Sequence, residues 1–181
     1  MEFNKAYPYH FIGKFPQSNG ILLAEHCFDF IGKSRVEYIV QVDEYEHKLF
    51  CLKFLIKGTE DNNTKFSTIT NNDDFIGIIS TCIEILMNEF WTKELHNNPS
   101  FFFIGANSKN EDKSITKRFR VYRQIIINKI SATNFFHYES KKESVYLLLN
   151  RNMCTNSPHI RDEIIKAFND FEVDMSALTI Q

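Results

Sequence analysis

The sequence predicts an α+β fold in which an antiparallel β-meander packs on a long central helix, followed by a strand, a basic helix, a β-hairpin and a C-terminal helix. Strand-like segments rich in β-branched and aromatic residues fill the first third of the 181-residue chain. Helical apolar stripes then alternate with apolar runs of strand length. Eighteen Phe and seven Tyr in a chain that is 43% hydrophobic can fill one core, so a single domain is expected over residues 1–181. Its parts are the meander at 7–57, the core helix at 72–95, a strand-helix-hairpin-helix half at 100–171 and a tail at 172–181.

The meander strands are separated by short polar turns. We expect them at residues 10–15, 21–31, 35–42 and 47–57. Turns this short indicate hairpins, and therefore antiparallel pairing. Apolar and polar residues alternate in the third strand, which places Glu37 and Gln41 on the face opposite Tyr38 and Val40. One face of this sheet is therefore expected to be solvated.

The core helix is predicted by an apolar stripe at helical spacing. The stripe consists of Phe75, Ile79, Cys82, Leu86 and Phe90. Asn and Asp at residues 72–74 can accept hydrogen bonds from the free N–H groups of the first turn. A stripe of this width predicts the main core element of the fold.

The second half of the chain adds four further elements. SFFFI at 100–104 is an unbroken apolar run, which is typical of a central strand covered on both faces. NFFHY and ESVYLLLN are expected to form a hairpin across the turn at 140–143. Ser157 as N-cap and Pro158 as first helical residue predict the start of a last amphipathic helix, and the tail after it shows no clear pattern.

A basic stretch at residues 105–130 carries seven Lys or Arg against two acids, in a chain of formal charge −2. Its periodicity predicts a helix over 112–129, docked through Ile115, Phe119, Tyr122 and Ile126. Lys113, Lys117 and Arg120 then share the outward face, while Arg118 and Arg123 lie at the boundary between buried and exposed. Arg clusters suit bidentate contact with phosphate or carboxylate groups.

The loop before this helix, with Asn107 and Ser108, leads from a strand end into a helix, a place where backbone N–H groups can meet an anion. The candidate phosphate- or partner-binding residues are Lys113, Lys117, Arg118, Arg120, Arg123, Asn107 and Ser108. GANSKN lacks the second Gly and the Lys-Ser/Thr pair of a phosphate loop, and Glu111 and Asp112 occupy the predicted helix start. The alternative interpretation is the solvated face of an ordinary helix.

Catalytic and metal signatures are sparse. His137, with Glu139 assisting, is the candidate for acid/base chemistry in a metal-independent nuclease. Strand alternation would place His137 and Tyr138 on opposite faces, which argues against a shared site. The four Cys stand singly without metal-ligand spacing, so we expect reduced thiols and no metal or cofactor.

Targeting signals are also sparse. The N-terminus MEFNKAYPYHF has no basic region followed by an apolar stretch, as a secretory signal would. The strongly apolar runs are shorter than the roughly 20 residues that cross a bilayer. We therefore expect a cytoplasmic protein that does not associate with membranes.

Several landmarks in the sequence resemble a family of small bacterial proteins described only as a domain of unknown function. The matching pieces are PYHF at 8–11, NEFW at 88–91, FFFIGANS at 101–108, KRFRVYRQII at 117–126 and NSPHI at 156–160. The resemblance implies a β-rich first half, an R-x-R-x-Φ helix after an aromatic strand, and a setting in host defence, mobile elements or toxin–antitoxin pairs. It implies no activity.

Three functions follow from these observations. The first is a non-enzymatic binding or regulatory protein whose basic helix (109–123) engages a nucleic acid, a phosphorylated ligand or an acidic partner. The second is an immunity- or antitoxin-like interaction module that uses the acidic and aromatic surface at 43–46, with a purely structural Arg helix. The third is the nuclease with His137. Exposed sheet edges would also permit a homodimer.

Overall fold

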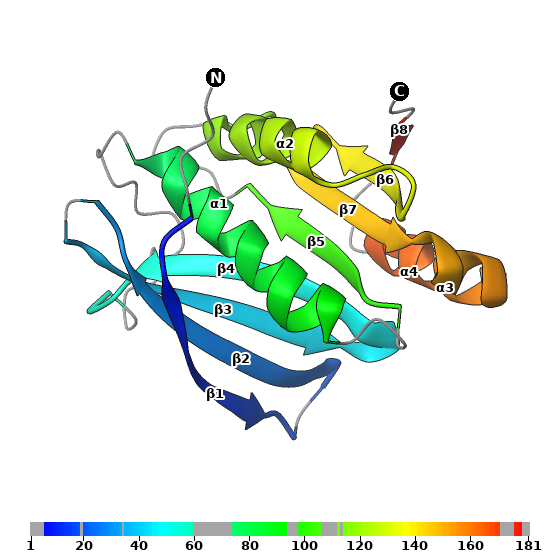
Figure 1. Cartoon of the computed structure of the whole chain (residues 1–181). Coiled ribbons are helices and arrows are strands. Elements are labelled where there is room, and N and C mark those ends of the chain that lie inside the picture. The colour runs from blue at the N-terminus through cyan, green and yellow to red at the C-terminus, as the bar shows by residue number, and fades with distance from the viewer. Residues whose placement is uncertain are drawn as a thin grey trace.

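The sheet is the organising element of the fold in the computed structural model, which describes residues 6–18, 20–33, 35–59, 74–93, 98–105, 112, 114–170 and 176–178. It has eight strands in the order β1-β2-β3-β4-β5-β7-β6-β8 (Figure 1). Their bounds are β1 Tyr9–Pro16, β2 Leu22–Ile31, β3 Glu37–Tyr45, β4 Leu49–Ile56, β5 Ser100–Ile104, β6 Phe135–Ser140, β7 Val145–Asn150 and β8 Ser176–Leu178. The helices are α1 Phe75–Ile85, continued by the π-helical segment η2 Leu86–Thr92, then α2 Lys117–Lys129, α3 Arg151–Asn156 and α4 Pro158–Asp170. This arrangement confirms the predicted α+β class.

Strand pairing follows the expected meander. Strands β1 to β4 are antiparallel neighbours, and β4 then pairs with β5 in parallel. A parallel pair needs a crossover connection, and the segment that contains α1 supplies it. From β5 onward the pairing is antiparallel again, through β7 and β6 to β8.

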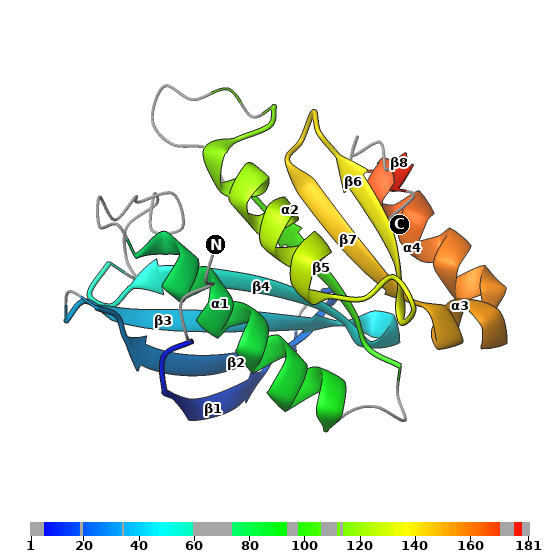
Figure 2. The same ribbon diagram turned by 45° about the horizontal axis from the view of Figure 1, so that its top comes forward.

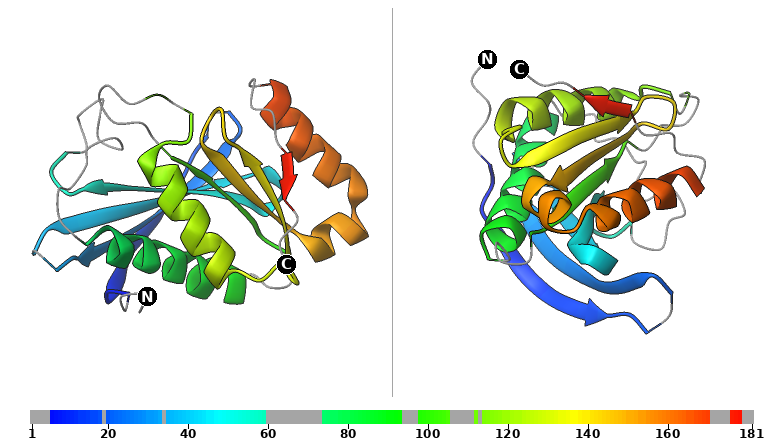
Figure 3. Two further views of the ribbon diagram at one scale, coloured as in Figure 1. Left: turned by 90° about the horizontal axis from the view of Figure 1, so that it is seen from above. Right: turned by 90° about the vertical axis from the view of Figure 1, so that its right-hand side faces the viewer.

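Helices cover the two faces of the sheet unequally. α1, η2 and α2 lie on one face, and α2 crosses β5 and β7 beside α1 (Figure 2). α3 and α4 lie on the other face, at the end of the sheet that holds β5, β7 and β6 (Figure 3). Strand β5 is therefore covered on both faces, as predicted: Phe101 and Phe103 join the core under α1 and α2, while Phe102 joins the core under α4.

The predicted stripe of the core helix is buried, with Ile79, Cys82, Leu86 and Phe90 in the main core. The helix from Phe75 to Thr92 is long and apolar enough to span a membrane, and 56% of it is buried inside the fold as its main core element. The helix begins at Phe75, directly after the predicted start at 72–74, but the Asp74 side chain makes no hydrogen bond to the first turn, and residues 72 and 73 lie outside the described part of the chain. Asp74 instead accepts the hydroxyl of Tyr7 at 2.6 Å and the N–H of Lys33 at 2.9 Å.

Two elements were missed by the sequence analysis. Helix α3 follows β7 directly because the Asn150 side chain accepts the N–H groups of Asn152 at 2.9 Å and Met153 at 3.2 Å. Strand β8 lies in the tail that showed no pattern, and it pairs with the edge of β6. A short edge strand is stabilised by backbone pairing, for which side-chain periodicity gives no signal.

Candidate functional site

Helix α2 begins at Lys117, five residues later than predicted. The Thr116 hydroxyl accepts the N–H of Phe119 at 3.1 Å and donates to the carbonyl of Gly105 at 2.8 Å. Ile115 lies outside the helix in a left-handed conformation with φ of 51° and is 43% exposed, so its predicted place in the docking face was wrong. Local capping by Thr116 overrides the apolar periodicity here.

The basic residues of α2 separate into two groups. Lys117 and Arg120 are exposed, as predicted. Arg118 is only 6% exposed, and Arg123 donates from Nε to the carboxylate of Glu139 at 2.5 Å. The expected boundary position of Arg118 was wrong because the buried face includes Ile125, which turns the helix so that Arg118 faces inward.

The predicted anion-binding loop uses part of its backbone internally. The N–H of Gly105 donates to the carbonyl of Ser144 at 2.8 Å, which ties the end of β5 to the turn between β6 and β7. Asn107, Ser108 and Lys113 lie outside the described residues. Phosphate or partner binding by this region stays a prediction, and the outward cations that the structure describes for it are Lys117 and Arg120.

The nuclease candidates His137 and Glu139 are buried beneath α2, at 3% and 4% exposure. The Nδ1 atom of His137 lies 2.9 Å from the hydroxyl of Tyr146, and its Nε2 atom has no hydrogen-bond partner within the described part of the chain. Glu139 accepts from Arg123 and lies 3.5 Å from the Lys141 ammonium group. Tyr138 packs on the opposite face, as strand alternation predicted. Neither candidate is placed where a substrate could reach it without movement of α2.

Burial, followed by the positive charge of Arg151, lowers the pKa of His137 to about 4, against a smaller opposing effect from the backbone of Ser131. A base whose pKa is lower in the folded protein than in the unfolded chain binds fewer protons when folded. It therefore destabilises the fold as the pH drops from about 6.5 toward 4.

We expect His137→Gln to reduce the loss of stability between pH 7 and pH 5 by about 2 kcal/mol, because glutamine does not titrate and can still bond to Tyr146. Urea unfolding of both proteins at the two pH values measures this difference. Equal losses for the two proteins would show that His137 is protonated without cost in the folded state.

The acidic surface proposed at residues 43–46 is partly internal. Glu44 is buried and accepts hydrogen bonds from Lys14, His26 and Lys48, each at 2.9 Å. Burial acts to raise its pKa, but these bonds outweigh burial and lower the pKa to about 2. Asp43 is also buried and paired with Lys53. Of this group, Glu46 is exposed and Tyr45 is half-buried, so only these two contribute to a surface.

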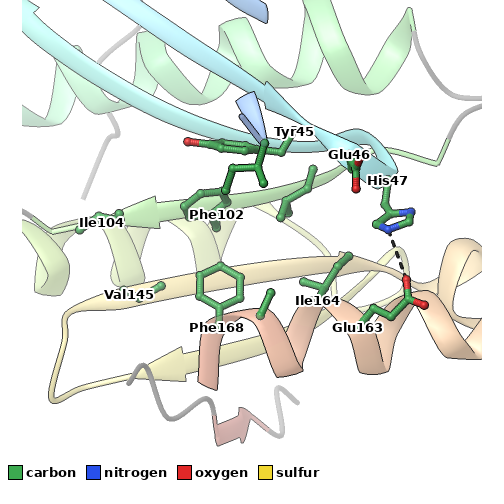
Figure 4. A pocket seen from close by; sticks show the side chains of 12 residues that line it. Tyr45, Glu46, His47, Phe102, Ile104, Val145, Glu163, Ile164 and Phe168 are labelled. Carbon is green, nitrogen blue, oxygen red and sulfur yellow. Dashed lines mark ion pairs between the residues drawn. The ribbon is translucent and has the colours of Figure 1, made fainter. Parts of the chain in front are cut away.

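A pocket of about 500 Å³ lies between α4 and the face of the sheet opposite α1 (Figure 4). We call it the α4 pocket. It is lined by Ile21, Tyr45, Glu46, His47, Leu49, Phe102, Ile104, Val145, Glu163, Ile164, Ala167 and Phe168. The lining is mostly apolar, with Glu46, His47 and Glu163 grouped at one end. A concave, largely apolar space of this size with a few polar groups is the usual form of a binding site.

Aromatic rings form one wall of the α4 pocket. The ring of Phe102 lies 5.8 Å from that of Tyr45 and 5.3 Å from that of Phe168, the latter edge to face. The Tyr45 hydroxyl donates to Asp43 at 3.3 Å, and Asp43 also accepts from Gln41 at 2.7 Å. The buried carboxylate thus holds the Tyr45 ring in place.

The polar end of the pocket is closed by an ion pair between two distant segments. His47 lies in the turn Glu46–Lys48 between β3 and β4, with φ of 57°, a conformation that few non-glycine residues adopt. This turn places His47 Nε2 at 3.3 Å from a carboxylate oxygen of Glu163 on α4 (Figure 4).

Two apolar side chains at the edge of the pocket are open to solvent. Ile21 is 64% exposed and Ile104 is 49% exposed. Exposed isoleucines that adjoin a pocket enlarge the apolar surface available to a partner, whereas single exposed side chains elsewhere need no explanation.

Because the comparisons with known proteins found no match, the class of this protein is defined by its fold and its site. No protein-family model matches the chain, and no curated protein or solved structure matches it. The resemblance to the small bacterial family therefore stays a prediction. The fold and the site define an α+β protein with an apolar pocket on the partly uncovered face of its sheet.

Sequence reasoning named parts of this pocket without bringing them together. It placed Tyr45 and Glu46 on a surface and Phe102 in a central strand, and it predicted that the last helix, which carries Ile164 and Phe168, is amphipathic. These segments are far apart in the chain, and their convergence depends on where α4 docks. Within the described residues, no three His, Cys, Asp or Glu side chains gather as metal ligands.

Proposed function

We propose that this chain is a non-enzymatic interaction protein that binds a protein partner by taking an apolar side chain of that partner into the α4 pocket. The observation that carries the proposal is the pocket of about 500 Å³ with a wall of Tyr45, Phe102 and Phe168 and exposed Ile21 and Ile104 beside it. Binding energy at protein interfaces concentrates where a large side chain fills such a pocket.

The surroundings of the pocket favour a protein segment over a free small molecule. Ile21 and Ile104 are exposed at the edge of the pocket, so the apolar surface continues outward from it. An apolar surface that continues outside a pocket suits a partner that covers both. The resemblance to small bacterial proteins supports a setting in defence, mobile-element or toxin–antitoxin biology for this interaction.

The contacts of the arginines of α2 also favour the α4 pocket over α2 as the binding surface. Arg118 is buried and Arg123 is bound to Glu139, so two of the predicted cationic contacts serve the fold. The second candidate function, nucleic-acid binding by α2, is favoured by the exposed Lys117 and Arg120. Two outward cations would give a weak and strongly salt-dependent interaction.

A peptide-display selection tests the proposal. Peptides selected on the wild-type chain are expected to bind Ala167→Trp, in which the indole fills the pocket, at least about tenfold more weakly. Ala167 is an exposed helical residue, so the larger side chain leaves the fold intact. Isothermal titration calorimetry measures the affinities, and circular dichroism checks that each variant is folded.

Two control variants locate the interaction. Ile31 is an isoleucine outside the pocket lining whose exposure, 56%, lies between those of Ile21 and Ile104 in the lining. Ile31→Glu is expected to leave the affinity for the peptides unchanged. Lys117→Glu combined with Arg120→Glu is likewise expected to have no effect. Peptides that bind Ala167→Trp as well as wild type would overturn the proposal. Salt-sensitive binding of RNA, single-stranded DNA or duplex DNA that the double variant loses would instead make α2 the functional surface.

A further inference from the structure

Apart from His47, the charged side chains that line the α4 pocket are acidic. Glu46 and Glu163 line it and are both exposed, against the single imidazole of His47. Burial is the main cause of the raised pKa of the Tyr45 hydroxyl, and the nearby carboxylates of Asp43 and Glu25 also raise it. The nearby Lys53 is paired with Asp43. The pocket edge therefore presents an apolar surface beside a negative potential.

The two lining carboxylates lie on opposite sides of the polar end of the pocket. Glu46 precedes the turn residue His47 on the sheet side, and Glu163 projects from α4 on the helix side (Figure 4). A chain that lies across this end of the pocket passes both carboxylates. The Glu163 side chain is 58% exposed, so its pairing with His47 at 3.3 Å leaves it accessible to a second cation.

Resting on the proposed function, we infer that the partner segment carries Lys or Arg next to the apolar side chain that enters the α4 pocket. The aliphatic stem of Lys or Arg can lie over Ile21 or Ile104 while its charged end reaches Glu46 or Glu163. Complementary charges at the edge of an interface add specificity and speed association. An acidic segment would be repelled by the same two carboxylates.

Three blocked pentapeptides test the inference, each with a central tryptophan flanked on both sides by lysine, by glutamine or by glutamate. They are titrated into the isotopically labelled full chain at low and moderate salt, and shifts of the Val145, Ile164 and Ala167 methyl resonances report binding in the pocket. The lysine peptide is expected to bind about tenfold more tightly than the glutamate peptide at low salt, because each exposed pair contributes about 1 kcal/mol at most. The difference should shrink at moderate salt.

Two variants separate charge recognition from pocket binding. Glu46→Gln combined with Glu163→Gln is expected to bind the three peptides with equal affinity. His47→Gln keeps both carboxylates and is expected to keep the preference for lysine, which excludes loss of the ion pair as the cause.

The outcomes distinguish the inference from the function on which it rests. Equal binding of all three peptides to wild type, lost in Ala167→Trp, would overturn the inference and leave the proposed function standing. No shift of pocket resonances by any peptide, up to its solubility limit, would contradict both. Preference for the glutamate peptide would also overturn the inference.

Discussion

Replacing Arg123 with alanine is expected to lower the free energy of unfolding by about 3 kcal/mol, because it leaves the carboxylate of Glu139 buried beneath α2 without its main partner. Glu139 is 4% exposed, and Arg123 donates to it at 2.5 Å. Lys141 lies 3.5 Å away and is mostly exposed, so it offsets the loss only in part. Urea unfolding at pH 7 monitored by circular dichroism measures the change.

Arg120→Ala is the matched control for this prediction. Arg120 lies on the same helix with its side chain exposed, and its removal is expected to change stability by less than about 0.5 kcal/mol. Adding Glu139→Gln to Arg123→Ala should restore part of the lost free energy of unfolding, because burial of a neutral amide costs less free energy than burial of an unpaired carboxylate. Equal effects of Arg123→Ala and Arg120→Ala would show that the ion pair contributes nothing to the fold.

Gly105→Ala is expected to cost about 3 kcal/mol, because the added methyl group has no space. A Cβ at residue 105 would lie 2.7 Å from Thr116 Oγ1 and Phe119 Cβ and 2.8 Å from the backbone nitrogen of Phe119. These atoms belong to the capped first turn of α2. The clash can be relieved only by moving the helix away from the end of β5, which would also strain the hydrogen bond between Thr116 and the Gly105 carbonyl.

Gly13→Ala provides the comparison for Gly105→Ala. A Cβ at residue 13 would approach only the far end of the Phe15 ring, at 3.2 Å, and Phe15 is an exposed side chain that can move. We expect this change to cost less than about 1 kcal/mol by the same urea measurement. Equal losses at the two positions would contradict the close packing of β5 against α2.

Helix α2 has a structural role, and this role bears on which surface binds a partner. The hydroxyl of Thr116 fixes the start of the helix to β5, its N–H fixes it to Ser144 in the turn after β6, and the Arg123–Glu139 pair fixes the helix to β6 itself. A helix bound at so many points is a poor candidate for rearrangement around a ligand. The α4 pocket, in contrast, lies between α4 and the sheet and has the exposed side chains of Ile21 and Ile104 at its edge, so a partner can reach it without disturbing the core under α1 and α2.

Local patterns were sufficient for most of the fold. Alternation in β2 to β4, the stripe from Ile79 to Phe90, the apolar run of β5 and the Ser157-Pro158 start of α4 each reflect burial of one face of a single element. Burial of a face leaves a periodic signature in the sequence itself. The start of α2 was misplaced because Ile115 continued the periodicity across a boundary that Thr116 imposes through hydrogen bonds.

The site was less accessible to sequence reasoning than the fold. By itself the sequence determined the α+β class, the core helix, the exposed positions of Lys117 and Arg120 and the separation of His137 from Tyr138 by strand alternation. Only the tertiary structure decided that Arg118 faces inward, that Arg123, at the predicted boundary position, pairs with Glu139, that Asp43 and Glu44 are held by cations, and that Tyr45, Phe102 and Phe168 meet in one pocket. The physical reason is that periodicity reports which side of an element is buried, whereas pairing of charges and the shape of a cavity depend on which distant element docks there.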